Sequence, residues 1–303
     1  MDSLIAKQMA EKAFVEKVER FGRRKPQSKF EVLEKMNESV TRIAMRDDGR
    51  KFILKRSSLN QGIAGIASSR MYNQIGLNTP EMQPLSRKGR DFIITVQKDV
   101  SDLEGLETVL ARDDLDYQMI EHNFFTHDKW QIFYDTNLRN AFLKFMTPGC
   151  LEELENRFLV GEIQTEYDTW LRNMILCKTK GAKKYEHLIS IDLEELMIMQ
   201  LGQYGETFKD FIYRPYYSAT PQQTLDRGTS YRNRLWEILE LAQDGVLSRG
   251  NIDAIKKALG HDFPKELEEI CSQQIIYGRT RKNIVEPVKY LWDYARDTFE
   301  KGL

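Results

Sequence analysis

The chain has 303 residues, and its 45 lysines and arginines nearly balance its 46 aspartates and glutamates, giving a net charge of −1 at pH 7. A chain of this length can bury one large core or two smaller ones. The balanced charge provides no strong field to attract nucleic acid, so we expect no nucleic-acid partner.

The cysteines and histidines exclude further classes of protein. Three widely separated cysteines, Cys150, Cys177 and Cys271, make no metal-binding spacing and indicate a reducing compartment. Each is expected to behave as a small buried apolar residue. His122 and His127 are five positions apart without a carboxylate-rich helix around them, so a zinc site is not expected.

The apolar stretches bear on membranes and location. No stretch approaches the roughly 18 apolar residues of a membrane span, so no integral membrane contact is expected. The first seven residues lack the apolar core of a secretory signal. We therefore expect a cytoplasmic protein, and a bacterial effector exported without a classical signal would show the same features.

The first part of the chain predicts a helix, a linker and three short strands. Apolar residues at helical spacing predict an amphipathic helix over 2–22, and the basic, proline-containing stretch 23–28 predicts a linker. Alternating and β-branched residues then predict strands over 29–33, 40–45 and 51–55. The last two are joined by an Asp-Asp-Gly sequence, a strong hairpin signal, so the three strands are expected to run antiparallel.

The third of these strands ends in a lysine flanked by apolar residues. Phe52 and Leu54 share one face of the strand, and Lys55 lies on the opposite face with Ile53. A lysine on the inner face of a strand needs an anionic partner. The alternative is a lysine at a sheet edge whose ammonium group reaches water.

A helix and a second hairpin are expected next. Apolar residues lie along one helical stripe from Ile63 to Ile75, and Gly76 has the position of a C-cap. The segments 82–86 and 91–97 then predict two strands joined as a hairpin. After residue 100 the chain is predicted to be mainly helical, with strand character only over 174–192. The helix candidates cover 101–111, 137–146, 151–164, 194–204, 230–244, 251–259, 264–277 and 284–300.

Three oxygen-bearing side chains lie in and beside this strand-like segment. Asp168 and Asn173 form an Asp-x4-Asn pattern, and Asp192 follows a second apolar stretch. Phosphoryl transfer uses such a set, because one carboxylate positions the attacking group while an amide and a second carboxylate hold Mg²⁺. The alternative reading of the same residues is ordinary turn and helix-end chemistry.

The order of these features resembles the protein-kinase-like fold, and most closely its HipA-like and phosphatidylinositol-kinase-like bacterial branches. The resemblance covers residues 29–200. The segments that carry it are Phe52 to Lys55, Ser68 to Glu81, Phe92 to Lys98, Asp168 to Asn173, and Ile191 with Asp192.

The resemblance implies an α+β fold with two lobes. Residues 29–100 would form a small lobe of antiparallel sheet with one helix. Residues 101–303 would form a mainly helical lobe containing the catalytic loop and a helical extension. Residues 1–28 would precede both lobes as a helix and linker.

The resemblance also implies roles for individual residues, with ATP and Mg²⁺ as cofactors. Asp168 would orient or deprotonate an acceptor hydroxyl, Lys55 would hold the phosphates, and Asn173 and Asp192 would bind Mg²⁺. Two further pairs would contact the nucleotide: Asn37 and Ser39 at the phosphates, and the backbone around Gln97 and Lys98 at the adenine.

The sequence departs from the family pattern in four places. The connection 34–39 has no glycine, although phosphates are usually cradled by glycine-rich turns. No acid occurs over 57–80, and the position of the helix glutamate that would pair with the lysine is Gly65. No His-Arg precedes Asp168, and Asp192 is followed by Leu-Glu rather than Phe-Gly.

Three hypotheses remain open from the sequence. The chain is an active kinase that transfers a phosphoryl group from ATP to a hydroxyl of a protein or small molecule, with a protein as the expected acceptor. Alternatively it is a kinase-fold pseudoenzyme with a binding or regulatory role. The third hypothesis is an unrelated helical interaction protein whose Asp-x4-Asn pattern is accidental.

Overall fold

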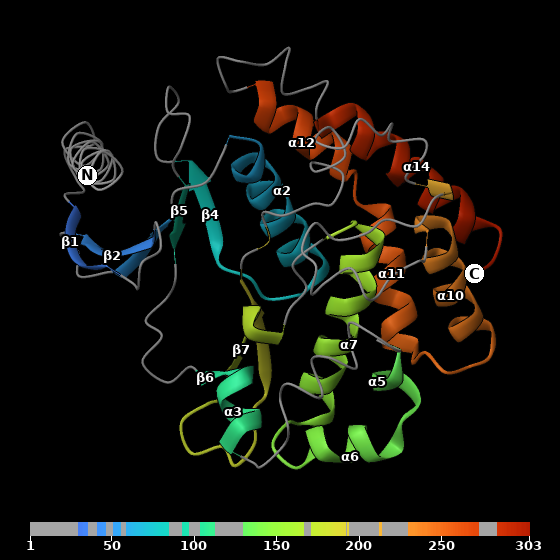
Figure 1. Cartoon of the computed structure of the whole chain (residues 1–303), viewed down its shortest axis with the longest axis horizontal. Coiled ribbons are helices and arrows are strands. Elements are labelled where there is room, and N and C mark those ends of the chain that lie inside the picture. Colours follow the sequence, from blue (N-terminus) through green and yellow to red (C-terminus); the bar gives the residue numbers. More distant parts are fainter. Residues whose placement is uncertain are drawn as a thin grey trace, which may run out of the picture.

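The computed structural model describes twelve stretches of the chain, and these define the fold (Figure 1). They are residues 30–35, 41–46, 51–55, 59–84, 93–96, 104–112, 130–166, 171–191, 193, 212–213, 230–272 and 284–303. The predicted helix 2–22, the linker 23–28, the first hairpin turn and the predicted helix 194–204 lie outside the described residues.

Five strands from the first part of the chain form one antiparallel sheet. Its strands run in the order β1-β2-β3-β5-β4, so β3 is central. The three predicted strands and the later hairpin are confirmed, because each neighbouring pair is antiparallel. The bounds are β1 Phe30–Lys35, β2 Thr41–Arg46, β3 Lys51–Lys55, β4 Glu81–Pro84 and β5 Ile93–Val96.

Helix α2, Leu59–Ile75, connects β3 to β4 and ends as predicted. Gly76 has a φ of 93°, a left-handed conformation that glycine adopts without a steric penalty. The N–H of Leu77 donates to the carbonyl of Tyr72 at 2.8 Å, which closes the last turn in a Schellman motif. Most of α2 is buried, because β4 packs on one side of it and α11 and α12 pack on the other (Figure 1).

A second, smaller sheet has the order β6-β7-β8. The strands are β6 Glu104–Gly105, β7 Met174–Cys177 and β8 His187–Ser190, and both pairs are antiparallel. The predicted strand character of 174–192 is confirmed. The helix predicted over 101–111 is partly wrong: helix α3 spans Leu106–Arg112, and the two residues before it pair with β7 instead.

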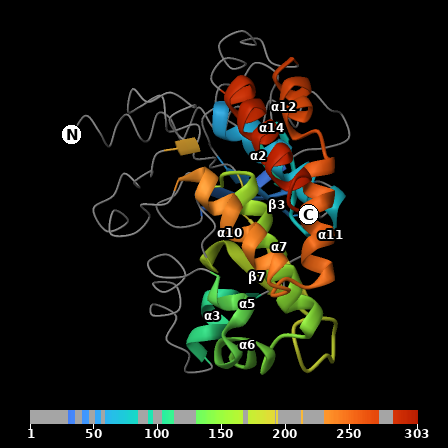
Figure 2. The same cartoon turned by 90° about the vertical axis from the view of Figure 1, so that its right-hand side faces the viewer.

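The remaining described elements are mainly helices, with α7 near their middle and α12 and α14 beyond α11 and α10 (Figures 1 and 2). Helices α6, α10 and α11 all contact α7, which is buried along most of its length. Within the described residues, no helix has the length and apolar character needed to cross a membrane. The bounds are α5 Gln131–Tyr134, α6 Thr136–Leu143, α7 Pro148–Ile163, α10 Tyr231–Gln243, α11 Arg249–Gly260, α12 Phe263–Ser272 and α14 Glu286–Glu300.

Side-chain caps explain where several of these helices begin. Thr147, Ser230 and Ser248 precede α7, α10 and α11, and each accepts a hydrogen bond from a backbone N–H in the first turn. The last helix, α14, buries Leu291 and Trp292 as its docking face. The buried residues of these helices belong to one hydrophobic core, which also includes the buried face of α2.

Candidate functional site

The β7–β8 hairpin sets the position of Asn173 relative to the end of β8. Asn173 is the last residue of a single 3₁₀ turn, Leu171–Asn173, and is 6% exposed. Met174 pairs with Ser190, and the N–H of Ile191 donates to the carbonyl oxygen of Asn173 at 2.9 Å. The backbone hydrogen bonds between the strands thus continue one step beyond β7 and β8. The last of them is at Ile191, the residue before Asp192.

The turn after α2 is attached to the other edge of β8. The N–H of Ser190 donates to the carbonyl of Asn78 at 3.0 Å, and Asn78 forms a parallel bridge with Ile189. Residues 68–81 are one of the segments that carry the kinase resemblance. The structure therefore connects this segment directly to the strand that leads to Asp192.

Lys55 occupies the last position of the central strand β3. It pairs with Thr41 of β2 on one side and with Ile93 of β5 on the other. A residue on a central strand has neighbours on both sides, so the alternative of a lysine at a sheet edge is excluded. Helix α2 begins four residues later, and it contains no acidic residue.

Six of the eight residues predicted for the site lie outside the described residues. Only Lys55 and Asn173 are described, and of Lys55 only the backbone. The other six predictions therefore remain untested: Asn37, Ser39, Gln97, Lys98, Asp168 and Asp192.

A buried ion pair lies immediately before the segment that contains Asp168. The side chains of Arg157 on α7 and Glu166 are 1% and 0% exposed, and they form a salt bridge. The hydroxyl of Tyr72 on α2 donates to the other carboxylate oxygen of Glu166 at 3.0 Å and accepts from Arg157 at 2.7 Å. Burial raises the pKa of Tyr72 well above 10, against an opposing effect of the Arg157 guanidinium, so its hydroxyl remains a neutral donor.

The connection between α7 and Glu166 is a second Schellman motif, but it has a threonine where glycine is usual. Thr165 has a φ of 61°, an unfavourable conformation for a β-branched residue. Its N–H donates to the carbonyl of Glu162, and the N–H of Glu166 donates to the carbonyl of Gly161 at 2.8 Å. The side chain of Gln164, one residue earlier, donates to the hydroxyl of Ser68 on α2 at 2.6 Å.

Two more carboxylates on α7 form buried polar contacts with neighbouring helices. Glu162 accepts from Arg234 of α10 at 2.6 Å. Glu155 pairs with Arg139 of α6 and accepts from Asn251 of α11. Burial raises the pKa of Glu155, and the Arg139 guanidinium opposes that rise. Each of these contacts joins α7 to a neighbouring helix.

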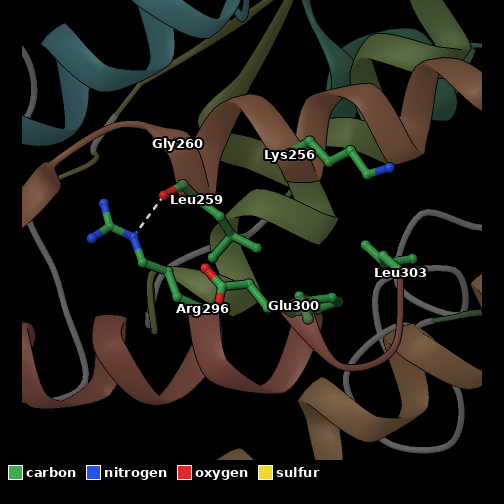
Figure 3. Close-up of a pocket in the computed structure, with 7 residues that line it drawn as sticks. Lys256, Leu259, Gly260, Arg296, Glu300 and Leu303 are labelled. Carbon is green, nitrogen blue, oxygen red and sulfur yellow. Dashed lines mark hydrogen bonds between the residues drawn. The ribbon is translucent and has the colours of Figure 1, made fainter.

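Among the described residues, no three His, Cys, Asp or Glu side chains gather closely enough to hold a metal ion. A cavity of about 440 Å³ lies between α11 and α14, beside Leu303 (Figure 3). Lys256, Arg296 and Glu300 line it, and Arg296 donates to the carbonyl of Leu259 at 2.8 Å. None of the predicted site residues lines this cavity.

Comparison with known proteins identifies the fold. No protein-family model matches the chain, and no curated protein sequence matches it significantly. The structure is similar to the crystal structure of the Helicobacter pylori proinflammatory kinase CtkA, with a TM-score of 0.57 and 10% sequence identity. That similarity covers 89% of this chain and 96% of CtkA.

Two weaker similarities are to structures of CtTel1. The open conformation of CtTel1 has a TM-score of 0.38 and 13% identity, over 90% of this chain and 11% of that chain. The FAT and kinase domain of CtTel1 has a TM-score of 0.33 and 14% identity, over 90% of this chain and 21% of that chain. Neither score is high enough to support a conclusion about this chain.

The sheet order, the helix after β3 and the CtkA comparison together define a kinase-like fold. The sequence-based expectation of that fold is confirmed at this level. The narrower resemblance to the HipA-like branch remains a resemblance of sequence motifs.

Proposed function

We propose that this chain is a two-lobed, ATP- and Mg²⁺-dependent phosphotransferase that acts on a hydroxyl of a protein or small molecule. The observation that carries the proposal is the pairing of Asn173 with Ile191 at the open end of the β7–β8 hairpin. This pairing, which supports the proposal, joins the backbone of the Asn of the Asp-x4-Asn pattern to Ile191, the residue that precedes Asp192. A lysine on the central strand of the other sheet completes the set.

The proposed reaction breaks the bond between the γ-phosphorus of ATP and the oxygen that bridges it to the β-phosphate. A bond forms from the acceptor oxygen to the same phosphorus, and ADP leaves. Asp168 orients the acceptor hydroxyl and receives its proton. Lys55 holds the α- and β-phosphates, so it stabilises bound nucleotide and positions it for attack.

The donor chemistry of Asn173 and Asp192 fits magnesium. An amide oxygen and a carboxylate are hard oxygen ligands, and Mg²⁺ in phosphoryl-transfer sites takes one or two protein ligands together with phosphate oxygens and water. When bound, the ion neutralises charge on the β- and γ-phosphates. The burial of Asn173 and the hydrogen bond to its backbone carbonyl support a fixed backbone position for this proposed ligand.

A kinase-fold pseudoenzyme is the second candidate, and one observation favours it. Helix α2 contains no acid, and Gly65 occupies the position where the family's lysine partner is expected. Without that acid, α2 offers Lys55 no charged partner, which would weaken the alignment of the phosphates for transfer. Nucleotide binding without turnover would then be the function of the site.

The test uses purified full-length protein, Mg²⁺ and ATP labelled at the γ-phosphate. Label is followed on the chain itself, on added protein acceptors and as free phosphate, with Asp168→Asn assayed in parallel. Transfer or release that is lost in Asp168→Asn supports the phosphotransferase. Mg²⁺-dependent binding without any turnover supports the pseudoenzyme, and absence of Mg²⁺-dependent ATP binding contradicts both.

A further inference from the structure

Two side chains on one face of α2 contact the residues on either side of Thr165. Ser68 and Tyr72 are one helical turn apart, so they lie on the same face of α2. Ser68 accepts from Gln164 at 2.6 Å, and Tyr72 donates to Glu166 at 3.0 Å. We use the name α2 latch for these four side chains together with Arg157.

Every member of the α2 latch is buried. Exposure is 0% for Ser68 and Tyr72, 1% for Arg157 and 2% for Gln164 and Glu166. The guanidinium of Arg157 also lies over the ring of Tyr72, with its central carbon 4.8 Å from the ring centroid. Separating the charges of such a buried cluster would leave them unpaired away from water, which is costly. The cluster therefore holds α2 and residues 164–166 in one arrangement.

The backbone between the two contacts is strained, and the α2 latch explains why the strain persists. A threonine with a φ of 61° is disfavoured by contact between its Cβ and the backbone. Such a conformation persists when the flanking residues are fixed by other interactions. Here Gln164 and Glu166 are both held from α2, so Thr165 has no freedom to relax.

From this geometry we infer that Glu166 is a positioning residue for the proposed phosphoryl transfer. Tyr72 and Arg157 hold its carboxylate, and Glu166 fixes the chain two residues before Asp168 relative to α2. The inference rests on the proposed function for the role of Asp168. Helix α2 contains no acid that could pair with Lys55. Its buried side-chain contacts through Ser68 and Tyr72 reach the residues just before Asp168 instead.

The test is a pair of tyrosine-to-phenylalanine variants in the full chain. Tyr72→Phe keeps the ring and removes the hydroxyl that joins α2 to Glu166. Tyr231→Phe is the matched control: Tyr231 is 1% exposed and its hydroxyl donates to the carbonyl of Ile163 at 2.7 Å, outside the α2 latch. If Tyr72→Phe fails to fold, Ser68→Ala replaces it, since it removes only the hydroxyl that accepts from Gln164.

Two readouts are made on each variant. The first is amide hydrogen exchange of peptides covering residues 164–174, which needs no activity. We expect exchange at least about fivefold faster in Tyr72→Phe, because the variant loses the two buried hydrogen bonds of the hydroxyl, and no change in Tyr231→Phe. The second is steady-state transfer, where we expect a lower kcat for Tyr72→Phe with an unchanged KM for ATP.

Each outcome decides the inference. Unchanged exchange in Tyr72→Phe, or equal acceleration in both variants, overturns the α2 latch whether or not the protein is an enzyme. Faster exchange with unchanged kcat overturns the positioning role alone. If wild-type protein transfers no phosphoryl group, the proposed function fails, and the exchange result still shows whether α2 holds the segment.

Discussion

The N–H of Ile191 and the carbonyl oxygen of Asn173 are joined by a 2.9 Å hydrogen bond at the open end of the β7–β8 hairpin. This bond fixes the register at the end of the hairpin where the two proposed magnesium ligands lie, Asn173 just before β7 and Asp192 shortly after β8. A slip of one residue would turn the side chains of one strand to the other face of the sheet. The register therefore decides whether Asn173 and Asp192 can share an ion.

Removing the proposed base is expected to abolish transfer and preserve binding. In Asp168→Asn, the acceptor hydroxyl loses the group that orients it and takes its proton, so kcat is expected to fall by roughly 100- to 10,000-fold. The dissociation constant for Mg²⁺-ATP, measured by calorimetry, is expected to change by less than about threefold, since Asp168 has no proposed contact with the phosphates. Asp253→Asn, an exposed site on α11, is the control and should match the wild type in both measurements.

Removing the proposed phosphate ligand is expected to weaken nucleotide binding. Lys55→Met loses a charge-assisted hydrogen bond to phosphate, which corresponds to roughly a 10- to 100-fold rise in the dissociation constant for ATP. Lys51→Met is the matched control, because Lys51 starts the same strand and pairs only with Met45 of β2 among the described strands. Equal effects of the two substitutions would show that Lys55 has no special contact with the nucleotide.

The buried ion pair Arg157–Glu166 and the exposed ion pair Arg70–Glu266 are expected to differ in their contributions to stability. Glu166→Gln leaves the buried guanidinium of Arg157 without its carboxylate, so the free energy of unfolding should fall by about 3–5 kcal/mol. Glu266→Gln breaks the ion pair with Arg70, whose side chain is 43% exposed. This substitution should lower the free energy of unfolding by only about 0–1 kcal/mol. Urea unfolding followed by circular dichroism gives both values, and similar losses would contradict the assignment of Glu166 to a buried network.

The three thiols are expected to react with iodoacetamide at very different rates in the folded protein. Burial raises the pKa of Cys150 to about 12 and that of Cys271 to about 11, and it also raises the pKa of Cys177. Cys177 is only half-buried, whereas Cys150 and Cys271 are buried, so reagent reaches it more easily. Alkylation requires thiolate, so all rates rise with pH, and at pH 8 Cys177 should be labelled first.

Mass spectrometry of peptides gives the order of labelling. In denaturant the three thiols should become equivalent, because burial is the main cause of their differences. Labelling of Cys150 as fast as Cys177 in the native protein would show that α7 is less well packed around Cys150 than the structure has it.

The sheet and α2 could be predicted because each depends on local signals. The Asp-Asp-Gly turn between two alternating segments predicts the β2–β3 hairpin, and the structure has that pairing. Gly76 predicts the end of α2 because a left-handed residue is needed there, and its φ of 93° confirms it. The position of Lys55 at the end of β3 follows from the same strand pattern.

The α2 latch could not be predicted, because its members are far apart in the chain. Tyr72 and Glu166 are separated by 94 residues, and neither lies in a motif that specifies the other. The one local signal is Arg157, a charged residue in the buried part of α7 that requires a buried partner. Similarly, the two-residue strand β6 pairs with β7 some 70 residues later, so Glu104 and Gly105 appeared to belong to a helix.

The most direct measurement of the central claim is a crystal structure with Mg²⁺ and a non-hydrolysable ATP analogue. We predict that Lys55 Nζ lies about 3 Å from a phosphate oxygen, and that oxygens of Asn173 and Asp192 lie about 2.1 Å from Mg²⁺ at the same triphosphate. A nucleotide bound elsewhere, or these three groups facing separate surfaces, would contradict the proposed function.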